Sequence, residues 1–196
     1  MKLLCLLLLP ALLVFQSCKK EESDPKFSLP PATQTGANTL GFEVDGRVWV
    51  NYGKRCYSLT GNGRCLENTV KATMSIDNGV RTLSVWAGFT AEGYDENFNL
   101  TIDTLRGPGV YVTGKSRYKP LPNAVIPPSN GLFLSANDGA YQYISQLQKP
   151  THITVTRVDY AQRIISGTFE GQLEDGRPPG KYVTIQYGRF DIAYTQ

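Results

Sequence analysis

The sequence has few of the residues that build metal and redox sites. Its 196 residues include one histidine, four cysteines and two methionines. One imidazole and two spare thiols make a poor ligand set for a tetrahedral zinc ion, so we expect no metal site. An excess of charge of one sign is also lacking, because 20 basic and 17 acidic residues give a net charge of +3. That balance gives no electrostatic case for a nucleic-acid partner.

Long hydrophobic runs and helical periodicity are missing as well. The apolar stretch Leu3 to Phe15 contains Pro10 and is shorter than the roughly 20 residues of a membrane-spanning helix. Catalytic and cofactor-binding motifs are absent too. We therefore expect no enzyme activity and no bound cofactor.

The amino terminus has the pattern of a secretory leader. Lys2 gives it a positive end, the apolar stretch follows, and Ser17 is a small residue directly before Cys18. This arrangement predicts a signal peptide over residues 1–17.

The residues around Cys18 resemble the loose lipobox of Bacteroidota lipoproteins. The cysteine follows Phe15-Gln16-Ser17, with Phe15 where leucine is usual, and precedes the charged run Lys19 to Glu22, which is similar to their surface-export signals. The resemblance implies that Cys18 is lipidated, and several acyl chains make an effectively permanent membrane anchor. The alternative is an ordinary secretory leader, with Cys18 left as a free thiol.

Composition divides the rest of the chain into a linker and one domain. Residues 18–38 are charged and then rich in Pro, Thr and Gly, which predicts a lipidated cysteine on a flexible tether about 25 Å in typical span. Residues 39–196 are long enough to bury one hydrophobic core.

Two cysteines remain to pair in an oxidising compartment. They are Cys56 and Cys65, and a four-residue loop over Leu59–Asn62 would place them opposite each other on adjacent strands. We expect a structural disulfide, with metal binding as the weaker alternative.

Turn signals between short β-branched and aromatic runs predict an all-β fold, an antiparallel β-sandwich or barrel-like single domain. The Asp45-Gly46 pair predicts a two-residue hairpin. Its register sets Val44 against Arg47 and Phe42 against Trp49, so Trp49 is expected in the core.

The Asn78-Gly79 pair predicts a second hairpin, in which Trp86 lies opposite Lys71 on a mostly polar face. An indole beside a lysine stem on such a face is a candidate ligand-binding pair. The alternative is structural burial of Trp86 under a second layer.

A turn centred on Ala161 pairs Arg157 with Ile165 and places the lone histidine, His152, beside Glu170. The pair has no nucleophile and no third orienting group, so a solvated surface pair is expected rather than acid–base machinery.

Two segments have no clear register. The acidic segment Tyr94 to Asn99 could ligate calcium, but its spacing matches no EF-hand and a hydrated loop is the expectation. The proline-rich segment Lys119 to Asn130 is expected to be a long loop.

Motifs at both ends of the expected domain resemble a group of small Bacteroidota lipoproteins, an all-β family of unknown function. The motifs are Val44-Asp45-Gly46 followed by Trp49, Arg163 to Phe169, and Gly188 to Tyr194. The resemblance implies a fold and an outer-membrane address, and it implies no activity.

These observations favour a lipid-anchored outer-membrane or surface module that binds an envelope protein or a glycan. A glycan-binding accessory protein would use its aromatic residues, with Trp86 as the named candidate. A glycoside hydrolase is a lesser alternative, in which Glu170 and Asp191 would have to face each other across a cleft. A purely structural envelope protein is the third.

Overall fold

The computed structural model describes residues 27–57, 64–114, 130–177 and 180–196. No helix occurs in this part of the chain, and the strands account for nearly all regular structure. In chain order the strands are β1 (Thr39–Val44), β2 (Arg47–Val50), β3 (Lys54–Tyr57), β4 (Arg64–Glu67), β5 (Val70–Asp77), β6 (Val80–Ala91), β7 (Tyr94–Leu105), β8 (Gly109–Val112), β9 (Gly131–Ala136), β10 (Gln142–Ser145), β11 (His152–Asp159), β12 (Ile164–Asp175) and β13 (Tyr182–Thr195).

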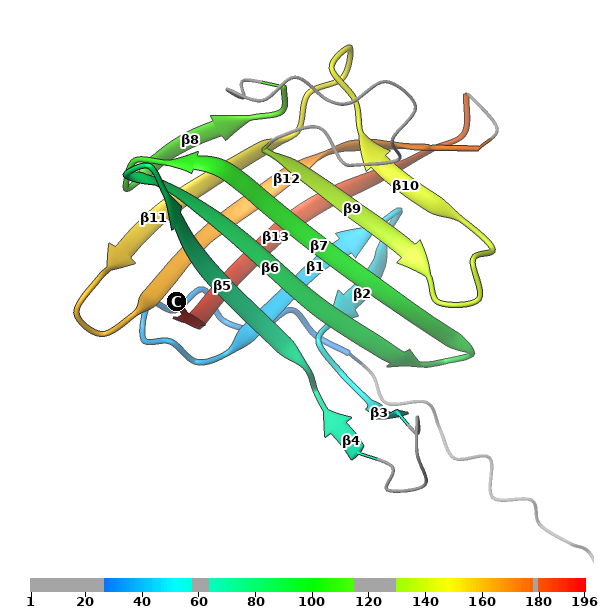
Figure 1. Ribbon diagram of the computed structural model, residues 1–196. Coiled ribbons are helices and arrows are strands. Elements are labelled where there is room, and N and C mark those ends of the chain that lie inside the picture. The colour runs from blue at the N-terminus through cyan, green and yellow to red at the C-terminus, as the bar shows by residue number, and fades with distance from the viewer. Residues whose placement is uncertain (1–26, 58–63, 115–129, 178–179) are drawn as a thin grey trace, which may run out of the picture.

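The strands form two layers that are joined at both sides. One layer runs β2-β1-β13-β12-β11-β8 and the other runs β5-β6-β7-β9-β10. The end of β13 pairs in parallel with β5, and β10 pairs with β12. Since β12 also pairs with β13, the chain of strand pairings that leaves β13 through β5 closes on β13 again. The two layers cross each other in Figure 1. The expected all-β, sandwich or barrel-like single domain is confirmed.

The core between the layers is rich in aromatic rings. Phe42 stacks on Trp49 with ring centroids 4.8 Å apart, and Phe98 lies 4.6 Å from Phe42 and 5.1 Å from Phe169. All four side chains are buried. The predicted pairs Val44↔Arg47 and Phe42↔Trp49 are present, and the prediction that Trp49 belongs to the core is confirmed.

The hairpin at Asn78-Gly79 has the predicted register. Both turn residues have positive φ, as this kind of two-residue turn requires, and Trp86 pairs with Lys71. The inward face of the hairpin is apolar, so the alternation of apolar and polar residues predicts this register correctly.

The β11–β12 hairpin has the predicted register only in part. His152 pairs with Glu170, as expected, but Arg157 pairs with Ser166 rather than Ile165. A bulge between Val155 and Arg157 adds one residue to β11, and alternation alone gives no signal for such an insertion.

Residues 27–38, which the sequence assigns to a flexible tether, lie against the sheet. The Phe27 ring is 4.9 Å from that of Tyr52 and 5.3 Å from that of Phe89. Arg189 donates a hydrogen bond from Nη1 to the Pro30 carbonyl at 3.3 Å. Apolar and hydrogen-bonding contacts hold this segment in spite of its composition.

Cys56 and Cys65 face each other on the small β3–β4 hairpin and are disulfide-bonded. This hairpin projects from the rest of the molecule in Figure 1. The buried Arg55 side chain fastens it to β7 through a hydrogen bond to the Glu96 carbonyl and an ion pair with Asp95.

Several predictions fall outside the described residues. These are the leader, Cys18 and the tether before Phe27, together with the loop 59–62 and residues 119–129. Within the described ranges no helix is long and apolar enough to span a membrane.

Candidate functional site

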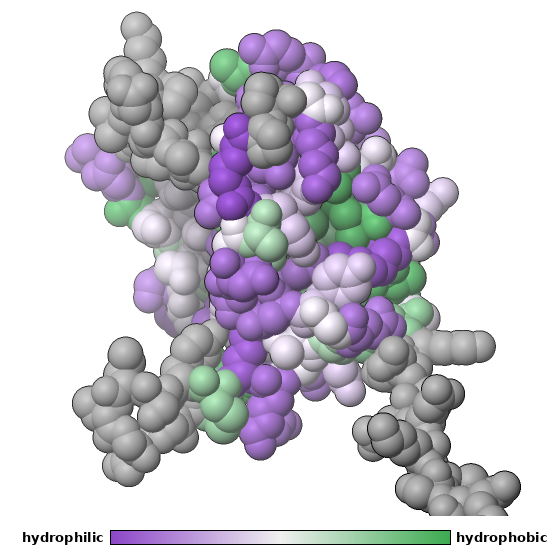
Figure 2. Space-filling view, turned by 90° about the vertical axis from the view of Figure 1, so that its right-hand side faces the viewer, coloured by the Kyte–Doolittle hydropathy of each residue, from purple (hydrophilic) through white to green (hydrophobic). Residues whose placement is uncertain are grey.

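A hollow opens between the two layers where several hairpins end. It has a volume of about 300 Å³, and we call it the mouth. Its lining residues are Val44, Asp45, Arg47, Tyr94, Glu96, Leu134, Tyr141, Tyr143 and Val183. The side of the molecule on which these hairpins lie faces the viewer in Figure 2 and is mostly hydrophilic, with small hydrophobic patches.

A buried ion pair forms the floor of the mouth. Arg47 donates from Nη2 to Oε1 of Glu96 at 2.8 Å and to Oε2 at 2.9 Å. The Glu96 side chain is 1% exposed and that of Arg47 is 23% exposed. Tyr141 completes the cluster, because its hydroxyl donates to Oε1 of Glu96. A buried carboxylate is tolerated only when it is paired and hydrogen-bonded in this way.

Aromatic rings wall the mouth. The Arg47 guanidinium lies 3.9 Å from the ring centroid of Tyr94 and 5.6 Å from that of Phe89, within the range of cation–π attraction. The Tyr141 and Tyr143 rings are 5.2 Å apart. The guanidinium is therefore held in place by a carboxylate and by aromatic faces.

The Tyr141 hydroxyl stays protonated. Burial raises its pKa well above the ordinary value, and the hydrogen bond to the Glu96 carboxylate raises it further. Tyr141 is therefore a fixed hydrogen-bond donor rather than a base.

The carboxylates of the mouth already have partners. Both oxygens of Glu96 are engaged by Arg47 and Tyr141, and Asp45 accepts a hydrogen bond at 2.8 Å from the Thr184 backbone N–H. Among the described residues no three His, Cys, Asp or Glu side chains come close enough to hold a metal ion. Rigid aromatic walls over a polar floor are typical of a site that orients a small ligand.

Trp86 and Lys71 lie elsewhere. They pair across β5 and β6 on the outer face, where Trp86 is half-buried and Lys71 is exposed. The Arg55 guanidinium lies 6.0 Å from the Trp86 ring centroid. Neither predicted residue lines the mouth.

The acidic segment Tyr94 to Asn99 is part of strand β7 rather than a loop. Alternation sends Glu96 inward to Arg47, while Asp95 and Asn97 point outward, where both contact Arg55. The carboxylates therefore face different partners on opposite sides of the sheet.

His152 and Glu170 pair on the outer face of β11 and β12, as the register predicts. Both are exposed, and they border a second hollow of about 380 Å³.

Asp191 is enclosed instead of facing a cleft. Its carboxylate accepts hydrogen bonds at 2.7 Å from the Thr33 hydroxyl and at 2.8 Å each from the Thr35 N–H, the Gly36 N–H and the Ser166 hydroxyl. Burial alone would raise the pKa of Asp191, but these hydrogen bonds outweigh it and hold the pKa well below the ordinary range.

This arrangement separates Asp191 from Glu170. Asp191 is 1% exposed, whereas Glu170 is exposed on the border of the second hollow. The two residues therefore lack the shared cleft that a pair of glycosidase carboxylates needs.

Sequence reasoning missed the mouth although one signal for it was present. The Asp45-Gly46 register places Arg47 opposite Val44, on the core face of the hairpin. A charged residue at a core position requires a buried partner, and the alternation of β7 offers Glu96. The pairing of β9 with both β7 and β10, which brings Tyr141 close to Glu96, has no comparable local signal.

No model of a known protein family matches the chain, and neither a curated protein nor a solved structure is similar enough to match it.

Proposed function

We propose that the protein is a lipid-anchored outer-membrane lipoprotein, exposed at the cell surface, whose mouth binds a small hydroxyl-bearing ligand about the size of one sugar unit. Its address is inferred from the leader and Cys18. Its role is inferred from the mouth and involves binding without turnover.

The observation that carries the binding proposal is the ion pair of Arg47 and Glu96 at the base of an open hollow. An apolar pair of similar volume often stabilises a fold as well as a buried ion pair does. The charged pair is therefore not explained by a gain in folding stability over an apolar pair. It does provide fixed polar groups beneath the aromatic walls of the mouth.

The dimensions and chemistry of the mouth favour a small ligand over a protein partner. About 300 Å³ lies at the lower end of the range for ligand cavities. Tyr94 is 40% exposed and can lie against the apolar face of a ring, while Asp45 and the tyrosine hydroxyls can meet its polar groups.

The chain enters the domain beside the mouth. Phe27 and Arg47 border one shallow hollow together with Val48 and Glu92. The nine peptide steps between Cys18 and Phe27 span at most about 30 Å. A lipid on Cys18 would keep the mouth close to the membrane surface.

The anchor is tested by the intact mass of the native product purified from membranes. We expect a chain that begins at Cys18 and carries added acyl mass. A chain that begins at Met1, or one that begins at Cys18 without lipid, would contradict the anchor and leave the binding proposal to stand alone.

The mouth is tested by calorimetric titration with a panel of monosaccharides. We expect Tyr94→Ala to weaken binding by about tenfold, since the ring supplies the stacking face. Tyr160→Ala is the matched control, because Tyr160 is also exposed by about two fifths and also lies under an arginine, Arg81. An equal loss of affinity in Tyr94→Ala and Tyr160→Ala would contradict a binding site at the mouth.

A further inference from the structure

Strand β13 carries an extra residue at Tyr187. Phe169 pairs with Gly188, but two residues later Gly171 pairs with Ile185, so β13 has one more residue than β12 across this interval. The register to β1 shifts at the same place. Tyr187 itself has a φ of 53°. Residues other than Gly, Asn and Asp rarely adopt this left-handed conformation.

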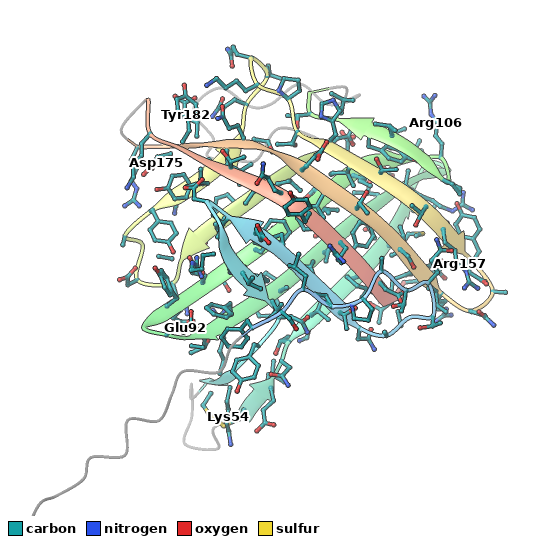
Figure 3. The ribbon with its side chains drawn as sticks, turned by 180° about the vertical axis from the view of Figure 1, so that it is seen from behind. Lys54, Glu92, Arg106, Arg157, Asp175 and Tyr182 are labelled. Carbon is teal, nitrogen blue, oxygen red and sulfur yellow. A yellow bond between two sulfur atoms is a disulfide. The ribbon has the colours of Figure 1, made fainter. Side chains whose placement is uncertain are left out.

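The bulge turns an aromatic ring toward solvent. Tyr187 is 60% exposed and borders the second hollow, of about 380 Å³, on the outer face of β11, β12 and β13. These strands face the viewer in Figure 3. Bulges of this kind re-aim side chains, and backbone strain in a non-glycine residue is concentrated at functional sites.

Close packing fixes the backbone beside Tyr187. A Cβ on Gly188 would lie 2.4 Å from Cδ2 of the buried Phe169, so no side chain fits at position 188. Arg189 donates from Nε to the Tyr187 carbonyl at 3.2 Å and from Nη1 to the Pro30 carbonyl at 3.3 Å. The bulge and the N-terminal segment are thereby held in one arrangement.

Polar groups surround the exposed ring. The hollow is lined by Ala32, His152, Thr154, Thr168, Phe169, Glu170, Tyr187, Gly188 and Arg189. The negative charge of Glu170 balances the positive charge of Arg189, and the His152 ring can donate or accept a hydrogen bond. The His152 and Glu170 side chains are exposed, and within the described part of the chain neither makes a side-chain hydrogen bond or ion pair that a ligand would have to break.

We propose that this hollow, the Tyr187 platform, binds a neutral pyranose unit of a glycan. The apolar face of the sugar ring lies on Tyr187, and its hydroxyl groups meet Glu170, His152 and the two threonines. The platform goes beyond the function proposed for the mouth, because it lies on the outer face of the sheet while the mouth opens between the layers.

The test is calorimetric titration of the full-length mature protein with maltopentaose, cellopentaose, xylopentaose and mannopentaose. We expect at least one of these to bind the wild type. Tyr187→Phe should keep the affinity, because the ring face is the contact, whereas Tyr187→Asn should lose about tenfold or more. Tyr160→Ala is again the control for an exposed tyrosine elsewhere.

Urea unfolding separates this role from a structural one. Asparagine tolerates positive φ, so Tyr187→Asn should have an unfolding midpoint at or above that of the wild type. A purely structural tyrosine would give a lower midpoint. If Tyr187→Asn does not fold, the exposed substitution Glu170→Gln must weaken binding instead.

Three results would overturn the platform: no binding by any of the four pentasaccharides, unchanged affinity in the folded Tyr187→Asn variant, or unchanged affinity in Glu170→Gln where that variant is needed. If affinity is lost in Tyr94→Ala alone, the glycan belongs to the mouth, which would support the proposed function and exclude the platform.

Discussion

Glu96 and Asp191 are equally buried, each 1% exposed, yet the protein surrounds them differently. Glu96 meets an opposite charge and a tyrosine hydroxyl at the floor of an open hollow. Asp191 meets backbone N–H groups and hydroxyls, several of them from the segment 33–37 that covers it.

The difference separates a carboxylate that joins distant segments from one that borders an open hollow. The donors around Asp191 come from distant parts of the chain, so the carboxylate ties the N-terminal segment to β12 and β13. The groups around Glu96 leave a cavity in front of them. Burial alone therefore does not distinguish the two carboxylates, whereas the nature of their partners and the open space beside Glu96 do.

The largest effect is expected from Asp191→Ala. The substitution leaves the buried Ser166 hydroxyl and the donors of the segment 33–36 without an acceptor, so the free energy of unfolding should fall by about 3 to 5 kcal/mol, as measured by urea denaturation. Asp138→Ala removes an exposed carboxylate that accepts one backbone hydrogen bond and should lower it by less than about 1 kcal/mol. Similar losses of unfolding free energy in both variants would contradict the stabilising role of Asp191.

Glu96→Leu should have the next largest effect on stability. It leaves the Arg47 guanidinium unpaired and should lower the free energy of unfolding by about 2 to 3 kcal/mol, less than a fully buried charge would because Arg47 is partly exposed. The double variant Arg47→Met/Glu96→Leu should recover most of this loss while ligand binding stays absent. A double variant that binds normally would show that the ion pair is only structural.

The pH dependence of stability tests the role of Asp191. Because the pKa of Asp191 is lowered by folding, its carboxylate contributes stability that is fully present above the ordinary value near 4 and is lost as the pH falls toward the lowered value. The stability gap between wild type and Asp191→Asn should therefore be constant from pH 7 to about 5 and narrow below about 4. Urea denaturation at a series of pH values measures it, and a gap that widens on acidification would contradict the assignment.

The smallest effects are expected from removing one hydrogen bond at each carboxylate. Tyr141→Phe removes a donor from Glu96 and Thr33→Val removes one from Asp191, and each should lower the free energy of unfolding by about 1 kcal/mol. Only Tyr141→Phe should alter ligand affinity in calorimetry. An equal effect of Thr33→Val on affinity would place the binding site outside the mouth.

The sequence predicted what depends on local alternation and turns. The registers at Asp45-Gly46 and Asn78-Gly79, the inward position of Trp49 and the His152–Glu170 pair follow from neighbouring strands joined by short turns. The parallel pairing of β13 with β5 joins segments more than 100 residues apart, and no local pattern specifies it. The bulges in β11 and β13 also escaped prediction, because one inserted residue has no distinctive composition.

The site was harder to predict than the fold because it consists of long-range contacts. Trp86 and Lys71 were candidates because an indole is unusual on a mostly polar face, yet neither residue lies at the mouth. Arg47, Glu96 and Tyr141 come from three separate hairpins, and each looks ordinary in its own segment. Asp191, which the sequence offered as half of a catalytic pair, holds the N-terminal segment instead.

The most direct test of a binding site at the mouth is a heteronuclear NMR titration of the mature domain with a panel of monosaccharides. We predict that at least one sugar shifts the backbone amide signals of Tyr94, Tyr141 and Val183, which line the mouth, and that Arg47→Met/Glu96→Leu abolishes these shifts. Shifts confined to other surfaces, or no shift at the mouth with any sugar of the panel, would contradict the account.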